Sequence, residues 1–228
     1  MPSPTWLADL PRNRLLGEFS MWSADLIRLA DDMKRIEDHA DILHIDVADG
    51  HFAPALLFFP DQVARMRAVT KLPIHVHLMV ADAVLLSQVD QFAEAGADLI
   101  SVHAENANAG EALDLIASRG IASGIVLRVE TPVTACRPFL DRIDFLTLLG
   151  TAIGVKGQGL DPKATARLQE AGRFISESGR RIALAADGGI RENTVPLLRA
   201  AGAGTVVMGS LAFGAEDLAA RMRWAHGL

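Results

Sequence analysis

Four side chains in this sequence have the types and spacing to bind a divalent metal ion together. His44 and Asp46 lie two residues apart in a short apolar run, and in an extended segment such side chains point to the same face. His77 and Asp187 each lie near the end of another short apolar run. Two imidazoles and two carboxylates suit zinc, manganese, iron or cobalt, with room left for substrate oxygens. We therefore expect one metal site.

The elements that must position these residues alternate regularly along the chain. Apolar runs predict strands at 15–21, 42–47, 74–79, 99–103, 122–127, 145–149, 182–186 and 205–208. Periodic stretches between them predict helices at about 24–39, 60–66, 83–95, 111–118, 132–140, 162–178, 193–201 and 212–224. Ser23 is placed to cap the first of these helices. Strict alternation over eight units in about 210 residues favours an α/β fold of the (β/α)8 TIM-barrel type over the alternative, an open doubly wound sheet.

A barrel also explains why the candidate ligands should meet. In this fold the functional side chains gather at the carboxyl ends of the strands. His44, Asp46, His77, His103 and Asp187 all fall at such ends. Their shared position supports the metal site more strongly than any one of them does alone.

The composition favours one soluble domain. Half of the 228 residues are hydrophobic and no low-complexity linker divides the chain, so we expect 15–228 to form a single catalytic barrel. Residues 1–14 contain three prolines and no clear periodicity, and we expect an irregular segment outside the barrel. Because there is neither a signal-peptide apolar region nor a run of about 18 apolar residues, we expect a cytoplasmic protein.

Charge and cysteine content exclude other classes of function. The formal charge of −6 gives no general attraction to nucleic acid or to an anionic membrane. Cys136 is the only cysteine, which excludes an intrachain disulfide and a thiolate metal cluster, and we expect a buried thiol. The expected partners are a small molecule and further copies of the chain, since barrels of this kind commonly associate.

Glycines follow the last two predicted strands. Gly188 and Gly189 come after the seventh strand, and Gly209 and Ser210 come after the eighth. Backbone N–H groups in such turns, close to a helix N-terminus, can bind a phosphate group. The alternative is that these glycines only form tight turns, but their joint position favours phosphate binding.

Five short motifs occur in order along the chain: Ser20-Met21-Trp22-Ser23-Ala24-Asp25, His44-Ile45-Asp46-Val47-Ala48-Asp49-Gly50-His51-Phe52, His77-Leu78-Met79-Val80, Asp187-Gly188-Gly189 and Gly209-Ser210. In order and spacing they resemble the ribulose-phosphate 3-epimerase family. The likeness extends from about residue 16 to the C-terminus. It implies a (β/α)8 barrel that inverts C3 of a ketose phosphate and interconverts D-ribulose 5-phosphate and D-xylulose 5-phosphate.

The resemblance also implies a role for each site residue. His44, Asp46, His77 and Asp187 would bind one divalent metal ion, and Asp46 and Asp187 would form the acid/base pair. Inversion beside a carbonyl needs a proton removed from one face and returned on the other, so one carboxyl group must be ionised and the other protonated. The metal would polarise the carbonyl. The expected substrate contacts are Ser20, His77, Met79, Gly154, Gly157, Gly188, Gly189, Gly209 and Ser210.

The loop 150–159, after the sixth predicted strand, departs from the family. Where the family has Asn-Pro-Gly-Phe-Gly-Gly-Gln, this sequence reads Ala-Ile-Gly-Val-Lys-Gly-Gln. A lid is still expected, with different stiffness and contacts, and Lys156 either reaches the substrate or lies in solvent. Met79 is retained, but Ala48 and Leu149 replace two methionines of the family pocket. These changes affect the substrate envelope and leave the proton-transfer groups unchanged.

The preferred substrate is therefore open. The same chemistry on a tetrulose or hexulose phosphate, such as allulose 6-phosphate, is one alternative. A decarboxylase of sugar or nucleotide phosphates would be expected to carry an Asp-x-Lys-x-x-Asp array, and Asp46-Val47-Ala48-Asp49 has no lysine. A non-catalytic barrel that binds metal and phosphate would not need two proton carriers.

For several residues near these motifs the sequence indicates only a general role. His75 is expected to be structural, and Trp22 and Phe52 are expected to pack. Asp49 and His51 would orient the ligands or form a turn. The side chains of His103 and Glu105 would border the pocket without an assigned role.

Overall fold

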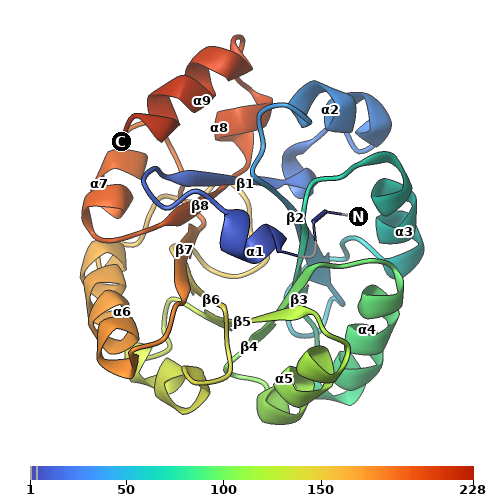
Figure 1. The fold of residues 1–228 in the computed structure, drawn as a ribbon, viewed down its shortest axis with the longest axis vertical. Coiled ribbons are helices and arrows are strands. Elements are labelled where there is room, and N and C mark those ends of the chain that lie inside the picture. The colour runs from blue at the N-terminus through green and yellow to red at the C-terminus, as the bar shows by residue number, and fades with distance from the viewer. Residues whose placement is uncertain (1, 4) are drawn as a thin grey trace.

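The computed structural model describes residues 2–3 and 5–228, and in them eight parallel strands close into a barrel (Figure 1). The strands are β1 (Leu16–Ser20), β2 (Ile42–Ala48), β3 (Ile74–Met79), β4 (Leu99–His103), β5 (Ala122–Leu127), β6 (Phe145–Leu149), β7 (Ala183–Asp187) and β8 (Thr205–Met208). They neighbour one another in chain order, with β8 pairing back to β1. Helices surround them, and the predicted (β/α)8 TIM barrel is confirmed.

The helices around the barrel differ from the predicted ones in three places. The described helices are α1 (Trp6–Asp9), α2 (Leu29–Ile36), α3 (Pro60–Val69), α4 (Asp82–Glu94), α5 (Ala109–Ser118), α6 (Ala164–Ser178), α7 (Val195–Ala200), α8 (Ser210–Phe213) and α9 (Leu218–His226). The prediction that Ser23 caps the first barrel helix is wrong, because Ser23 ends a 3₁₀ helix and α2 begins six residues later at Leu29.

The other two differences have local causes. The predicted helix 132–140 is a 3₁₀ helix, Val133–Phe139, that contains Pro138, and proline lacks the N–H group that an α-helix interior needs. The predicted helix 212–224 is divided into α8 and α9. The Asp217 carboxylate accepts a hydrogen bond of 2.8 Å from the Ala220 N–H group, which caps a new helix start.

Strand β2 shows how the barrel separates apolar from polar side chains. Leu43, Ile45 and Val47 are buried in the large core outside the barrel, where the helices pack. His44 and Asp46 alternate with them and therefore point to the barrel interior. The register places Asp46 beside His77 of β3, so the two predicted ligands lie on adjacent strands at the same level.

Residues 6–10 of the N-terminal segment cover the bottom of the barrel. The segment was expected to be irregular, but it contains α1, which lies across the centre of the barrel in Figure 1. Its apolar side chains pack on the first residues of three strands, in a cluster of Trp6, Leu7 and Leu10 with Ile42, Leu99 and Phe145. Met1 and Pro4 lie outside the described residues. The division into a segment and a single barrel domain stays a prediction.

Two further expectations concern the whole chain. In the part that the structure describes, no helix is both long enough and apolar enough to cross a membrane. The Cys136 thiol is fully buried, as expected, and burial raises its pKa to about 11. The cytoplasmic location and the homo-oligomeric state stay predictions.

Candidate metal centre and active site

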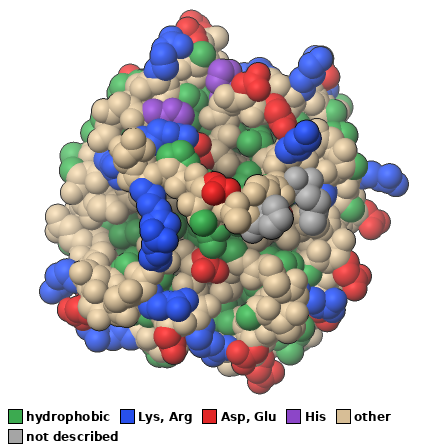
Figure 2. Space-filling view, viewed as in Figure 1, with side chains coloured by type: hydrophobic (Ala, Val, Ile, Leu, Met, Phe, Trp, Pro, Cys, Tyr) green, Lys and Arg blue, Asp and Glu red, His purple; other side chains and the backbone are tan. Residues whose placement is uncertain are grey.

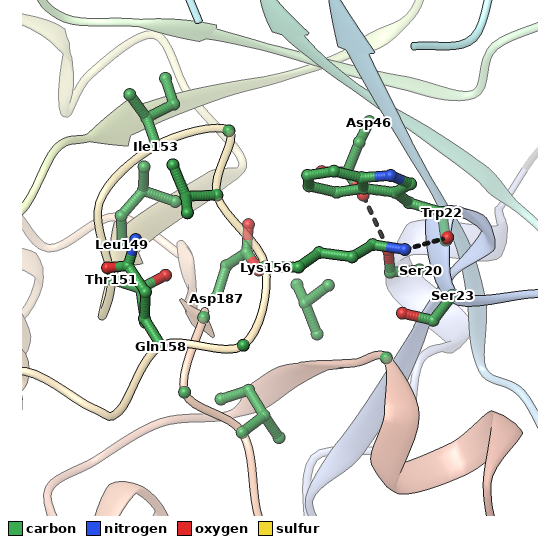
Figure 3. Close-up of a pocket in the computed structure, with 18 of the residues that line it drawn as sticks. Ser20, Trp22, Ser23, Asp46, Leu149, Thr151, Ile153, Lys156, Gln158 and Asp187 are labelled. Carbon is green, nitrogen blue, oxygen red and sulfur yellow. Dashed lines mark hydrogen bonds between the residues drawn. The ribbon is translucent and has the colours of Figure 1, made fainter. Parts of the chain in front are cut away.

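A cavity of about 350 Å³ opens at the C-terminal ends of the strands. Figure 3 shows its wall, with Ser20, Asp46 and Asp187 on strands and Lys156 reaching in from the loop 150–159. All the predicted substrate contacts line this cavity: Ser20, His77, Met79, Gly154, Gly157, Gly188, Gly189, Gly209 and Ser210. Their contact with a substrate stays a prediction.

The four predicted metal ligands come together at the base of this cavity. His44 and Asp46 from β2, His77 from β3 and Asp187 from β7 each offer a ligand atom, and these atoms lie within 4.8 Å of one another. The parallel register pairs Asp46 with His77, His44 lies two residues earlier on the same face of β2, and closure of the barrel brings β7 to the same mouth. The structure therefore contains a cluster that could hold a divalent ion.

Two unpaired ring nitrogens indicate that a metal ion fits this cluster. His44 Nε2 and His77 Nδ1 are buried and have no hydrogen-bond partner among the described residues. They lie 3.4 and 3.5 Å from Asp46 Oδ1, and His77 Nδ1 lies 3.7 Å from Asp187 Oδ2. A buried polar atom without a partner costs free energy, and four convergent N and O atoms are a donor set that zinc or manganese accepts.

The other nitrogen of each imidazole is hydrogen-bonded to a buried group. His44 Nδ1 lies 2.9 Å from Glu18 Oε2, and His77 Nε2 lies 2.8 Å from His103 Nε2. Glu18 was not among the predicted site residues. The available signal was a carboxylate inside an apolar strand, two residues before Ser20 and so on the same face.

The two carboxyl groups of the site have opposite electrostatic environments. Burial tends to raise the pKa of Asp46, but the His44 and His77 imidazoles outweigh it and hold that pKa well below its usual range. Ser20 Oγ also donates to Asp46 Oδ2 at 2.7 Å. Burial raises the pKa of Asp187 to about 6, and the charge of Asp46 adds to the rise. One carboxyl group is thus ionised near neutral pH while the other can carry a proton, as proton transfer requires.

Two glycines of the cavity, Gly188 and Gly189, are required by backbone geometry. Gly188 and Gly189 have φ values of +90° and +70°, and a Cβ atom on Gly189 would lie 2.7 Å from Leu160 Cα. A Cβ atom on Gly209 would lie 2.6 Å from Ser23 Oγ. A tight turn alone therefore accounts for Gly188 and Gly189, and phosphate binding at the turns after β7 and β8 stays a prediction.

The altered loop 150–159 lies across the cavity. Lys156 Nζ donates to the Trp22 carbonyl oxygen at 2.6 Å and lies 4.6 Å from the centre of the Trp22 ring (Figure 3). Ile153 packs with Met79 and Ala48 in a small apolar cluster. Lys156 thus points into the cavity, and Trp22, expected only to pack, forms part of the cavity wall.

The sequence of this chain is similar to those of known proteins. A sequence model described as the ribulose-phosphate 3 epimerase family matches residues 18–213. The ribulose-phosphate 3-epimerase of Bacillus subtilis (strain 168) is 36% identical over 201 residues, which are 87% of this chain and 92% of that protein. The ribulose-phosphate 3-epimerase of Escherichia coli (strain K12) is 36% identical over 202 residues, with 87% and 88% covered.

Similar solved structures include two barrel enzymes. A 3-hexulose-6-phosphate synthase matches with a TM-score of 0.64 and 19% identity, over 94% of this chain and 98% of that one. Orotidine 5'-phosphate decarboxylase from Pyrococcus horikoshii OT3 matches with a TM-score of 0.66 and 12% identity, over 92% and 97%. At these identities the likeness concerns the fold alone.

Proposed function

The chain belongs to the ribulose-phosphate 3-epimerase family of isomerases, and from this premise we propose that it interconverts D-ribulose 5-phosphate and D-xylulose 5-phosphate by inverting C3. One structural observation supports this reaction in addition to the family membership. Asp46 and Asp187 face the same cavity with opposite shifts in pKa.

In the proposed reaction these two carboxyl groups exchange a proton with C3 from opposite faces. One carboxylate removes the C3 proton, and the other carboxyl group delivers its own proton to the opposite face, so that the pair ends with one proton as it began. Asp46 is kept ionised by its imidazole neighbours and by the Ser20 hydroxyl, whereas Asp187 is the group that can hold a proton near neutral pH. In the reverse direction the two exchange roles.

A divalent metal ion is part of the proposal. His44 Nε2, Asp46 Oδ1, His77 Nδ1 and Asp187 Oδ2 would hold it, since these atoms converge and both ring nitrogens have no partner among the described residues. When bound, such an ion stabilises negative charge on the substrate oxygens that flank the reacting carbon. Zinc, manganese, iron and cobalt all suit the donor set.

The rest of the cavity suits a small anionic sugar. Its volume of about 350 Å³ is near the lower limit for ligand pockets, roughly 300–1,000 Å³. The Lys156 ammonium group extends towards Trp22 and Ser23, and Ser23 Oγ is next to Gly209. We assign the substrate phosphate to this side of the cavity, between Lys156 and the turns after β7 and β8.

Two residues of the cavity leave a second substrate possible for the same reaction. Leu149 forms the cavity wall where the family has methionine, and Lys156 enters a loop where the family has glycine. Both residues line the cavity and shape the space available to the substrate. A tetrulose or a hexulose phosphate such as allulose 6-phosphate is therefore the alternative substrate for the same reaction.

Deuterium incorporation at C3, followed by NMR in heavy water, tests the proposal. Metal-loaded protein is incubated with ketose phosphates of four, five and six carbons, and an Asp187→Asn variant serves as the matched control. Fastest exchange with ribulose 5-phosphate would support the main proposal, and fastest exchange with another sugar would favour the alternative. No exchange with any sugar would overturn the epimerase proposal in favour of a binding role.

A further inference from the structure

A buried carboxylate lies beneath the metal cluster, inside the barrel. Glu18 on β1 is fully buried, and its Oε2 atom lies 2.9 Å from His44 Nδ1 and 2.6 Å from His75 Nδ1. Its other oxygen accepts a hydrogen bond of 3.2 Å from Thr205 Oγ1. A buried charge is tolerated only when hydrogen-bond donors surround it.

The proton positions on His44 follow from this arrangement. An ionised carboxylate can only accept hydrogen bonds, so Glu18 Oε2 requires an N–H group on the Nδ1 atom of His44. An imidazole that binds a metal ion is neutral and carries one N–H, so a proton on Nδ1 leaves the Nε2 lone pair for the ion. That Nε2 atom is the unpaired one that faces Asp46.

A second chain of hydrogen bonds ends on His77. Glu105 accepts from the Arg128 N–H group at 2.9 Å and from Thr131 Oγ1, and its Oε2 atom lies 3.0 Å from His103 Nδ1. His103 Nδ1 therefore carries a proton and its Nε2 does not. His103 Nε2 can then only accept from His77 Nε2, 2.8 Å away, which leaves the lone pair of His77 on Nδ1.

We infer that Glu18, and Glu105 acting through His103, are positioning residues that fix which nitrogen His44 and His77 present to the metal ion. The inference rests on the metal site of the proposed function and extends it. Two independent chains arrive at the same result, because the atoms left with lone pairs, His44 Nε2 and His77 Nδ1, are the two that converge on Asp46 Oδ1. A carboxylate behind a ligating imidazole both orients the ring and strengthens it as a donor.

Zn²⁺ affinity provides the first test, measured by competition with a chromophoric chelator at constant pH. We expect Glu18→Gln and Glu105→Gln each to bind Zn²⁺ about 10–100-fold more weakly than the wild type, because a neutral amide lacks the negative charge that strengthens the imidazole as a donor to the ion. Thr205→Val is the matched control, since Thr205 touches only the Glu18 oxygen that faces away from His44. Its affinity should stay close to that of the wild type.

Nitrogen-15 NMR of the imidazoles in Zn²⁺-loaded protein distinguishes a specific effect on one histidine ring from a general loosening of the structure. Wild-type His44 should carry its proton on Nδ1 and His77 on Nε2. Glu18→Gln should shift the His44 signals and spare those of His77, and Glu105→Gln should do the reverse. Equal shifts of both imidazoles in both variants would overturn the inference.

The outcomes also distinguish this inference from the proposed function. A wild-type protein that binds no Zn²⁺ would overturn the proposed metal site and the inference with it. Normal wild-type binding that neither glutamine variant weakens would overturn the inference alone.

Discussion

The barrel has a cavity at each end, and the two are nearly equal in size but unlike in chemistry. The one at the C-terminal ends of the strands measures about 350 Å³ and contains Asp46, His77 and Asp187. The one beside α1 measures about 360 Å³ and has an apolar floor that includes Leu7. Figure 2 shows this lower face, where hydrophobic side chains lie in a hollow beside blue Lys or Arg side chains. Arg12 is among the residues that line this cavity.

The difference teaches that unpaired polar atoms, rather than volume, mark the candidate site. Among the described residues that line the lower cavity, none has a buried polar side-chain atom without a partner. The upper cavity has His77 Nδ1, with His44 Nε2 directly behind it. Such atoms are costly to leave unpaired, so their convergence at one end indicates that this end is built for a ligand.

The largest expected effect is a loss of kcat when a carboxyl group of the upper cavity is removed. Replacing Asp187 by asparagine should lower kcat by about 10²–10⁴-fold, because the variant has no carboxyl group to carry the proton. The metal-free variant should melt no lower than the wild type, since the substitution removes a carboxyl group whose burial is unfavourable. Steady-state kinetics and thermal unfolding check both points. A variant with near-normal turnover would remove Asp187 from the acid/base pair.

At the lower end the expected effect is on stability. Leu99 is fully buried beneath α1, and Leu99→Ala should lower the free energy of unfolding by about 2–5 kcal/mol through lost burial and a residual cavity. The folded fraction should keep its kcat, since Leu99 lies at the opposite end of its strand from the cavity. Urea unfolding together with activity per folded molecule would show this. A parallel loss of kcat would mean that the two ends are coupled.

Metal affinity should depend on pH at the upper end. In the metal-free protein the pKa of Asp187 is about 6, and Asp46 and Glu18 outweigh burial and raise the pKa of His44. The ion binds deprotonated ligands, so Zn²⁺ affinity should fall as pH decreases, and more steeply below about 6, where Asp187 also takes up a proton, by up to tenfold per pH unit for each proton displaced. Calorimetric titration between about pH 5 and 8 measures the slope. Leu99→Ala should leave it unchanged, and a flat profile in the wild type would contradict the prediction.

The smallest effect concerns the mouth of the upper cavity. Lys156→Ala should raise KM for the ketose phosphate by about tenfold, the value expected for loss of one charged hydrogen bond, with little change in kcat. Lys156→Arg, which keeps the charge, should retain most of the affinity. If KM is unchanged in the alanine variant, then Lys156 contacts only Trp22 and not the substrate.

Much of the fold could be predicted because each strand is a short apolar run between turns. All eight strands were placed to within about two residues, and closure into a barrel follows from their number and alternation. The helix errors have a common cause, since ends and helix type depend on local contacts that periodicity does not report. Pro138 and the cap at Asp217 are examples.

The sequence predicted the four residues of the candidate metal site but not the hydrogen bonds that hold them in place. His44, Asp46, His77 and Asp187 could be grouped because parallel strands bring their ends to one edge. The contacts of Glu18 could not be foreseen, because they depend on the tilt of β1 against β2 and β3. His103 and Glu105 were expected to border the pocket but are not among the residues that line the cavity, and their hydrogen bonds to each other and to His77 depend on side-chain rotamers.

The single thiol described above makes this protein a convenient subject for measuring transient opening. Cys136 is fully buried and its pKa is about 11, so both access and reactivity are suppressed in the closed barrel. A thiol reagent should therefore label the chain only while the wall around the helix 133–139 is open. At low reagent concentration the labelling rate then reports the free energy of that opening, without any engineered probe.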